Sequence, residues 1–142
     1  MKTYLFSARG RINRASYWLA AAIYMGVAAV AQLLIAIATA LLPSSVGADG
    51  EKAMSGLQIA VLTIPSILVY GAIIWSSVCV AVKRVHDRDR SGWFVLVQFV
   101  PVVGWIWFFV EAGCLRGTVG PNRFGPDPLM DAASVRRLQP AE

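Results

Sequence analysis

Residues 17–42 read YWLAAAIYMGVAAVAQLLIAIATALL, a continuous apolar stretch without a charged side chain. The stretch lies inside a charge-free window from Ala15 to Ala48, and two more charge-free windows follow it along the chain. Each window reaches the roughly 20 residues that a helix needs to cross a hydrocarbon core about 30 Å thick. The sequence therefore predicts helices near residues 17–42 and 57–82 and a third apolar segment near residues 93–115.

The composition excludes an ordinary water-soluble domain. Of the 142 residues, 57% are apolar and 15% are charged, whereas soluble domains average about 45–50% apolar and about 25% charged residues. A soluble fold of this size could not bury so much apolar surface and still present a polar exterior. A membrane β-barrel would need alternating apolar and polar residues, and residues 33–38, LLIAIA, do not alternate. We therefore expect an all-α integral membrane protein.

The first apolar stretch is predicted to remain in the protein as a signal-anchor helix. Signal-peptide cores span about 7–15 residues, and the apolar run from Tyr17 to Ile37 is longer than that. Cleavage stays open as the alternative, because residues 38–40, Ala-Thr-Ala, resemble a cleavage site. We assign residues 1–130 to a single multi-pass membrane domain and residues 131–142 to a polar, flexible tail.

The distribution of Lys and Arg predicts which side of the membrane each polar segment occupies. Four of these residues precede the first helix, one (Lys52) lies in the first loop, four lie in the second loop and four follow Cys114. Because cytoplasmic segments are enriched in Lys and Arg, we expect the amino terminus and the second loop to be cytoplasmic.

The third apolar segment is predicted to break at Pro101–Gly104. Proline lacks an amide donor and glycine adds backbone freedom, so residues 93–100 and 105–115 would form half-helices of about 12 and 16 Å, too short to cross singly. We favour a re-entrant hairpin, which would give twelve cytoplasmic Lys and Arg against one outside. A straight third span of about 34 Å stays open as the alternative, although it would divide these residues eight against five.

Three polar motifs flank the apolar segments: GRINRASYW at residues 10–18, RVHDRDRSGW at residues 84–93 and GTVGPNRFGPDP at residues 117–128. In order and spacing they resemble the patterns Gly-Arg-x-x-Arg-x-x-Tyr-Trp, Arg-x-His-Asp with Ser-Gly-Trp, and Gly-Thr-x-Gly-x-Asn-Arg-Phe-Gly-x-Asp-Pro of bacterial inner-membrane proteins grouped as domain of unknown function 805. The resemblance covers nearly the whole chain and implies a small multi-pass inner-membrane protein without an established activity. Glu111 and the residues beyond Pro128 fall outside the family pattern.

The polar motifs supply the candidate site. Because polar groups at a membrane edge tend to satisfy one another, we expect the arginines of the second loop to pair with nearby aspartates and to hold this loop against the tail. The expected pairs are Arg84 or Arg88 with Asp87, Asp89 or Asp127. The residues predicted to bind a lipid headgroup or a partner are Arg11, Arg14, Arg84, His86, Asp87, Arg88, Asn122, Arg123 and Asp127.

His86 is the only histidine and leaves several hypotheses open. Beside Asp87 and Asp89 it could carry protons, sense pH or act as a general base. One imidazole with two carboxylates is a poor metal signature, and we predict no metal, cofactor or catalytic residue. The nucleotide-binding pattern Gly-x-x-x-x-Gly-Lys-Ser/Thr is absent from the sequence. Glu111 would either pair with Arg116, which we favour, or relay protons.

The predicted function is that of a scaffold or accessory protein whose basic cytoplasmic face binds anionic lipid headgroups or a partner protein. Basic residues at a membrane surface attract anionic lipid with about 1 kcal/mol each. A homo-oligomer or a membrane-protein partner is compatible with this role, and no nucleic acid is expected. The alternative is an oligomeric transporter of small solutes or ions, with half-helices meeting at residues 101–104. A third hypothesis is an enzyme that acts on a lipid phosphate through His86 and Asp87.

Overall fold

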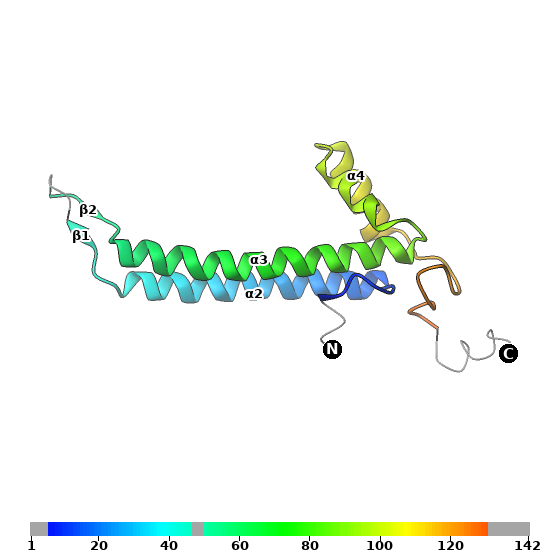
Figure 1. The fold of residues 1–142 in the computed structure, drawn as a ribbon, viewed down its shortest axis with the longest axis horizontal. Helices are drawn as coiled ribbons and strands as arrows, with labels where there is room; N and C mark the ends of the chain where they lie inside the picture. Colours follow the sequence, from blue (N-terminus) through cyan, green and yellow to red (C-terminus); the bar gives the residue numbers. More distant parts are fainter. Residues whose placement is uncertain (1–5, 47–49, 131–142) are drawn as a thin grey trace. The chain divides into compact units, whose positions relative to one another are not determined.

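The computed structural model describes residues 6–46 and 50–130, and its main elements are helices (Figure 1). The elements in chain order are α2 (Arg14–Ala40), β1 (Ser45–Val46), β2 (Lys52–Ala53), α3 (Gly56–Asp87), the 3-10 helix η1 (Gly92–Phe99), α4 (Val103–Phe108) and the π-helix η2 (Phe109–Cys114). The predicted class, a helical membrane protein, is confirmed. The proposed polar tail, residues 131–142, lies outside the described residues.

α2 and α3 have the length and composition of membrane-spanning helices. They contain 27 and 32 residues, with a mean hydropathy of 2.2 and 2.1 over an 18-residue window in each, and at 1.5 Å per residue they measure about 40 and 48 Å. Both exceed a hydrocarbon core about 30 Å thick, so their ends reach beyond it. Their exposed side chains include large apolar residues suited to contact with lipid: Ile23, Met25, Leu33, Leu34, Ile64, Ile67, Leu68 and Ile74.

The helix boundaries differ from expectation beside the polar motifs. α2 begins at Arg14, three residues earlier than predicted, because the side-chain oxygen of Asn13 accepts a hydrogen bond from the Ser16 amide at 2.8 Å and caps the first turn. α3 continues to Asp87, five residues beyond the predicted end. The second polar motif therefore begins on a helix, which fixes the orientation of its first residues.

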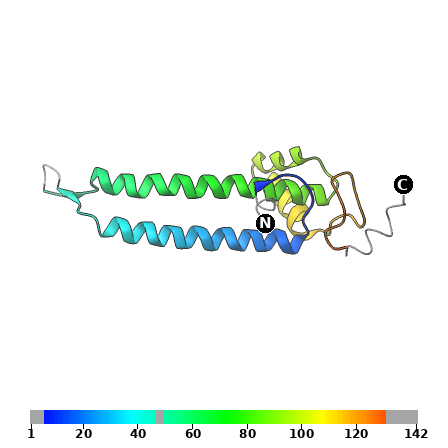
Figure 2. The ribbon, with the colours of Figure 1, turned by 60° about the horizontal axis from the view of Figure 1, so that its bottom comes forward.

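The chain divides into two compact units, residues 1–21 with 75–142 and residues 22–74. Within the second unit, the segments of α2 and α3 run alongside each other in both views (Figures 1 and 2). Gln32 donates from Nε2 to the Tyr70 hydroxyl at 3.0 Å and links the two helices. The assignment of residues 1–130 to one domain stays a prediction.

In the second unit, Gln58 forms hydrogen bonds both at the start of α3 and near the end of α2. Its side-chain Oε1 accepts from the Ser55 backbone amide at 2.8 Å, and its backbone amide donates to Ser55 Oγ at 3.2 Å. This is the reciprocal pattern of a capping box. Its Nε2 also donates to the carbonyl oxygens of Thr39, at 3.3 Å, and Leu42, at 3.2 Å, at the end of α2. The loop is thus held by one buried side chain as well as by the antiparallel pairing of β1 with β2.

The third apolar segment, in the first unit, turns back on itself as predicted. Between η1 and α4 the backbone of Val102 has a positive φ of 62°, and the returning half packs beside η1 (Figure 1). Gly104 permits this approach, because a Cβ at that position would lie 1.9 Å from the carbonyl oxygen of Val97. The predicted break at Pro101–Gly104 is confirmed, and the segment does not continue as a straight helix.

The core of the first unit joins the end of α3 to both halves of this hairpin. Its buried apolar residues come from α3, η1, α4 and η2, with Tyr17 of α2 packed against them. They are Ala81, Val85, Val95, Phe108 and Ala112. The hairpin is therefore anchored at the last turns of α3, where the second polar motif begins.

Candidate functional site

The carboxylate of Asp87, in the last turn of α3, binds two buried arginines. Arg11 Nη2 lies 3.0 Å from Asp87 Oδ1, and Arg84 pairs through Nη1 with Asp87 Oδ2. The exposed fractions of these residues are 9% for Arg11, 0% for Arg84 and 2% for Asp87. Buried ion pairs are favourable only when the remaining donors and acceptors are satisfied as well.

The remaining donors of Arg11 reach the chain after the hairpin. Nη1 donates to the carbonyl oxygens of Gly120 at 2.7 Å and Gly125 at 3.3 Å, and Nη2 donates to that of Thr118 at 2.7 Å. Arg11 precedes α2, whereas its acceptors follow η2. The amino-terminal segment, the end of α3 and the third polar motif therefore meet in one cluster.

Arg84 satisfies the end of η2. Its Nε donates to the carbonyl oxygen of Ala112 at 2.6 Å, Nη2 donates to that of Leu115, and Nη1 lies 3.5 Å from that of Ile12. The last carbonyls of a helix have no partner within it, so Arg84 acts as their cap. Arg11, Arg84 and Asp87, predicted as ligand-binding residues, thus hold the fold together, and their burial leaves no donor that faces a headgroup.

The third polar motif is bonded directly to the end of α3. Thr118 donates to the carbonyl oxygen of Asp87 twice, from its amide at 2.8 Å and from its hydroxyl at 3.0 Å. Asn122 donates from Nδ2 to the carbonyl oxygen of His86 at 2.9 Å. The predicted contact of loop and tail is present, and the expected pair Arg84–Asp87 is confirmed.

Glu111 of η2 has different partners from those expected. Its Oε1 lies 3.2 Å from Arg88 Nε and 2.6 Å from Arg90 Nε, and its side chain is 6% exposed. The predicted pairing of Glu111 with Arg116 is wrong, because the π-helical turn buries Glu111 toward the segment between α3 and η1. Arg88 accordingly pairs with Glu111 and not with an aspartate.

The remaining residues of the predicted site do not form ion pairs with Asp87. Arg123 pairs with Asp89 at 3.2 Å on the exposed surface. The ring of His86 stacks on Phe124 with centroids 3.8 Å apart and planes at 4°, and its buried Nδ1 has no hydrogen-bond partner among the described residues. Within residues 6–46 and 50–130, no three His, Cys, Asp or Glu side chains gather as a metal site would require.

Asp127 fixes the shape of the tail through backbone amides. Its Oδ2 accepts from the Gly120 amide at 3.1 Å and its Oδ1 from the Leu129 amide at 2.9 Å. Burial alone would raise the pKa of Asp127. These two amides, together with the charges of Arg11 and Arg116, outweigh burial and hold its pKa below the ordinary value of 3.8. The expected pairing of Asp127 with Arg84 or Arg88 is therefore replaced by bonds to the backbone.

Acid should loosen the tail by protonating Asp127. A carboxylate with a lowered pKa contributes its full stabilisation above the unfolded value and loses it as the pH falls through the folded value. We therefore expect the Gly120 and Leu129 amides to lose hydrogen-exchange protection, relative to intrinsic rates, only as the pH falls below about 3.8. In Asp127→Ala these amides should exchange fast already at pH 7. Unchanged protection in this variant would contradict the assignment.

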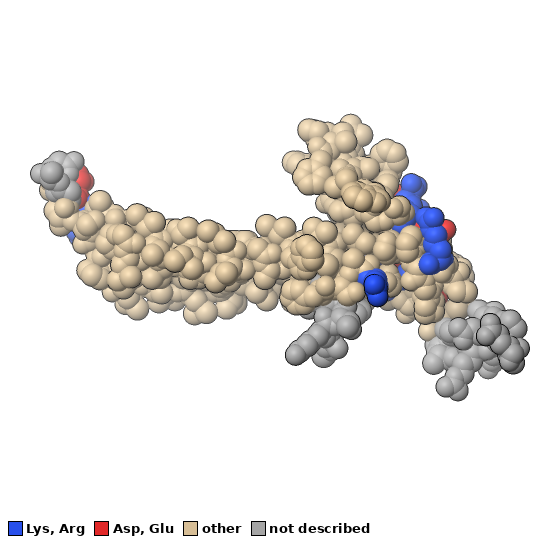
Figure 3. Space-filling model, in the orientation of Figure 1, with Lys and Arg blue, Asp and Glu red and all other residues tan. Residues whose placement is uncertain are grey.

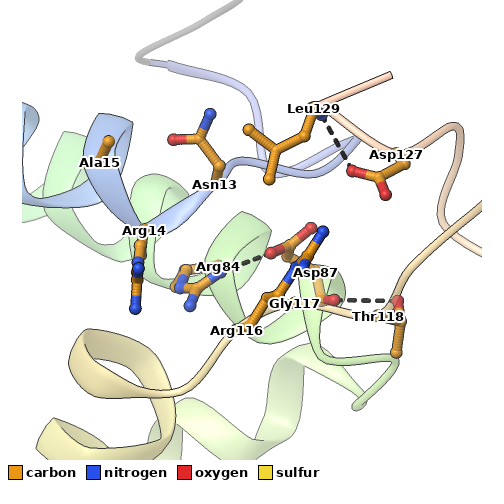
Figure 4. A pocket seen from close by; sticks show the side chains of 10 residues that line it. All are labelled: Asn13, Arg14, Ala15, Arg84, Asp87, Arg116, Gly117, Thr118, Asp127 and Leu129. Carbon is orange, nitrogen blue, oxygen red and sulfur yellow. Dashed lines mark hydrogen bonds and ion pairs between the residues drawn. The ribbon is translucent and has the colours of Figure 1, made fainter.

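A cavity of about 310 Å³ opens beside the Asp87 cluster, entirely within the first unit (Figure 4). We call it the arginine pocket, and its lining is Asn13, Arg14, Ala15, Arg84, Asp87, Arg116, Gly117, Thr118, Asp127 and Leu129. Figure 4 shows Arg84 between Arg14 and Asp87, with the Arg116 side chain overlapping Asp87 in this view. Unlike Arg84, both Arg14 and Arg116 are exposed.

Arg116 and Thr118 are absent from the predicted site residues. The available signal for Arg116 is its position, directly after the last apolar segment, where basic residues meet headgroups. Thr118 gives no such signal, because its contact with Asp87 depends on how the tail folds. Of the predicted residues, Arg14 lines the pocket with an exposed side chain. Arg88 pairs with Glu111, and Arg123 pairs with Asp89 but remains exposed.

Comparison with known proteins agrees with this architecture. The sequence matches the family described as "Protein of unknown function (DUF805)" over residues 5–126. The chain belongs to this family. Inner membrane protein YhaH of Escherichia coli strain K12 is 33% identical over 126 residues, covering 87% of this chain and 88% of that protein. Inner membrane protein YhaI of the same strain is 33% identical over 119 residues, covering 84% of this chain and 83% of that protein.

A third relative has a lower sequence identity to this chain. Uncharacterized protein YiiR of the same strain is 25% identical over 151 residues, covering 89% of each chain. No solved structure matches the chain significantly. The predicted DUF805 family is confirmed, and the names of YhaH and YhaI agree with the two long apolar helices in indicating an inner-membrane protein.

Proposed function

We propose that this DUF805 member is a non-enzymatic accessory protein whose basic end faces the cytoplasm and holds anionic phospholipid headgroups. The observation that carries the proposal is the set of exposed arginines in the first unit, over and above the buried ones that stabilise it. They are Arg9, Arg14, Arg90, Arg116 and Arg123, here called the basic face. In Figure 3 the blue atoms of this unit gather near the end of α3 and the hairpin.

The cytoplasmic orientation rests on the charge distribution and on Arg11. The bonds of Arg11 to the third polar motif support a common side for the amino-terminal segment and the tail, with the hairpin entering and leaving the membrane on that side. Every Lys and Arg except Lys52 then lies on one side, twelve against one. Such a bias is typical of the cytoplasmic side.

The geometry of Asp87 and His86 supports a non-enzymatic role. An acid–base pair needs a group with a free lone pair or proton that can reach a substrate. Both oxygens of Asp87 are engaged with Arg11 and Arg84, and His86 Nδ1, which has no hydrogen-bond partner among the described residues, is buried where a substrate does not reach it. These two residues are thus unsuited to the lipid-phosphate chemistry considered from the sequence.

Reporter fusions test the orientation. A fluorescent protein that matures only in the cytoplasm and a phosphatase that is active only outside it are fused to each terminus in turn. We expect fluorescence and no phosphatase activity at both ends. Phosphatase activity at either terminus would overturn the shared cytoplasmic side.

Lipid retention tests the binding role. The protein is released in mild detergent from membranes that contain equal amounts of phosphatidylglycerol and phosphatidylcholine, and the bound lipids are counted by native mass spectrometry. We expect severalfold enrichment of phosphatidylglycerol, which falls when all five arginines of the basic face become glutamine. Lys52→Gln, at the opposite loop, is the control that should change nothing. Equal retention of the two lipids by the unaltered protein would refute lipid binding and favour a protein partner instead.

A further inference from the structure

The arginine pocket contains two guanidinium groups that pair with no carboxylate in the part of the chain that the structure describes. Arg14 and Arg116 form no ion pair with any described residue, in contrast to Arg11, Arg84, Arg88, Arg90 and Arg123. Among the described residues, the Arg14 side chain makes one long hydrogen bond, of 3.4 Å from Nη1 to the carbonyl oxygen of Cys114. A guanidinium has five N–H donors, so both residues retain donors for a ligand.

The carboxylates in the lining are occupied. Asp87 is shared between Arg11 and Arg84, so it leaves Arg14 and Arg116 unneutralised. Asp127 accepts the amides of the tail, although its charge also acts on Arg116. An anion is therefore best accommodated by Arg14 and Arg116, the two exposed arginines of the lining.

The start of α2 adds to the positive potential of the pocket. Asn13, Arg14 and Ala15 belong to the lining, and α2 has no acidic residue in its first turn. The amino-terminal end of a helix carries about half a positive charge and orients free amides outward. Trp18, one turn further along, is partly exposed and donates from Nε1 to the Gly113 carbonyl oxygen at 3.1 Å. Tryptophan is enriched at headgroup depth in membranes.

We infer that the arginine pocket binds one phosphate group, with Arg14 and Arg116 as its ligands. The planar fork of arginine matches phosphate oxygens in two-point hydrogen bonds, and about 310 Å³ is ample for one phosphate. The inference deepens the proposed function, since it assigns a discrete site within the basic face. The phosphate comes either from a phospholipid headgroup or from free phosphate in solution.

Single substitutions test the site. Arg14→Gln and Arg116→Gln are compared with Arg9→Gln, an exposed arginine outside the pocket lining, and with Lys52→Gln. Dissociation constants for short-chain phosphatidylglycerol are measured on delipidated protein in detergent. Each pocket variant should weaken binding about tenfold, as expected for loss of a charge-assisted bond. Arg9→Gln removes one charge of the basic face but no side chain of the pocket, so it should weaken binding less than either pocket variant, and Lys52→Gln should leave binding unchanged.

The same variants separate the sources of phosphate. The melting temperature of the protein is measured with millimolar inorganic phosphate against chloride at equal ionic strength. If phosphate raises the melting temperature of the unaltered protein and Arg14→Gln abolishes this rise, free phosphate is a ligand. If phosphatidylglycerol binds tightly but phosphate does not raise the melting temperature, the ligand is the lipid headgroup. Both results support the site. Absence of both responses in the unaltered protein would overturn it.

Two outcomes distinguish failure of the site from failure of the proposed function. If Arg9→Gln, Arg14→Gln and Arg116→Gln weaken lipid binding equally, attraction is spread over the basic face, and the discrete site is refuted while the proposed function stands. If the unaltered protein does not discriminate phosphatidylglycerol from phosphatidylcholine, both fail. Should a glutamine variant not fold, Arg14→Lys and Arg116→Lys keep the charge without the fork, and each should still weaken binding severalfold. Unchanged binding in folded lysine variants would contradict the two-point contact.

Discussion

Asp87→Ala will prevent the protein from accumulating in the membrane as a folded species. The substitution leaves Arg11 and Arg84 buried without their counter-charge. Removal of one partner from a buried ion pair costs about 3–5 kcal/mol, a large part of the total stability of a small domain. We expect a melting temperature in detergent too low to measure, or complete degradation in cells. Circular dichroism and membrane-fraction immunoblots provide the measurement.

Asp89→Ala is the matched control for this substitution. Asp89 lies two residues further along and also pairs with an arginine, Arg123, but the side chains of this pair are 46% and 60% exposed. Exposed pairs contribute about 0–1 kcal/mol, so Asp89→Ala should accumulate normally. Asp87→Ala protein with the melting temperature of the Asp89→Ala variant would show that the Asp87 cluster does not stabilise the fold.

Gly117→Ala will detach the third polar motif from the end of α3. A Cβ at residue 117 would lie 1.9 Å from Asp87 Oδ2 and 2.4 Å from its Cγ, which is far inside van der Waals contact. Asp87 cannot yield, because two arginines hold its carboxylate, so the tail must move and Thr118 loses its bonds to the helix end. We expect a loss of about 2–4 kcal/mol in stability. Thermal unfolding and hydrogen exchange of the Thr118 amide measure the two effects.

Gly71→Ala provides the comparison for Gly117→Ala. Gly71 lies inside α3, and a Cβ there meets no atom within 4 Å. Alanine has a higher helix propensity than glycine, so this variant should be as stable as the unaltered protein or slightly more stable. A Gly117→Ala protein that melts together with Gly71→Ala would contradict the close packing of the tail on Asp87.

The helical frame could be predicted from the sequence because it depends on local composition. Long charge-free windows require helices in a membrane, and Pro101 with Gly104 predicted the reversal of the third segment. α3 extends to Asp87, beyond the predicted end at residue 82, because a helix does not have to end where its apolar window ends. A helix can continue into the polar zone when its last carbonyls find partners, here Thr118 and Asn122.

The partners within the site could be predicted only in part. Arg84 and Asp87 are three residues apart, and this spacing brings them together on any helix. The pairing of Glu111 with Arg88 and Arg90 depends on the π-helical turn. No local sequence pattern predicts this turn. Likewise, the six arginines of the polar motifs have side chains of the same length, so the sequence does not distinguish their partners. Which of them became buried and which remained exposed was decided by the packing of the tail.

The bonds of Arg11 also set an order of events during biosynthesis. Arg11 is separated by 107 to 114 residues from the carbonyl groups that it binds, so the ribosome makes the donor long before the acceptors. Arg11 therefore lacks these partners until both long helices and the hairpin have been synthesised. A nascent chain that stops short of Thr118 would leave Arg11 and the end of α3 without these partners. The cluster around Arg11 is therefore completed only after Gly125 has been synthesised, and products truncated before Thr118 should be degraded by membrane proteases faster than the longer chain.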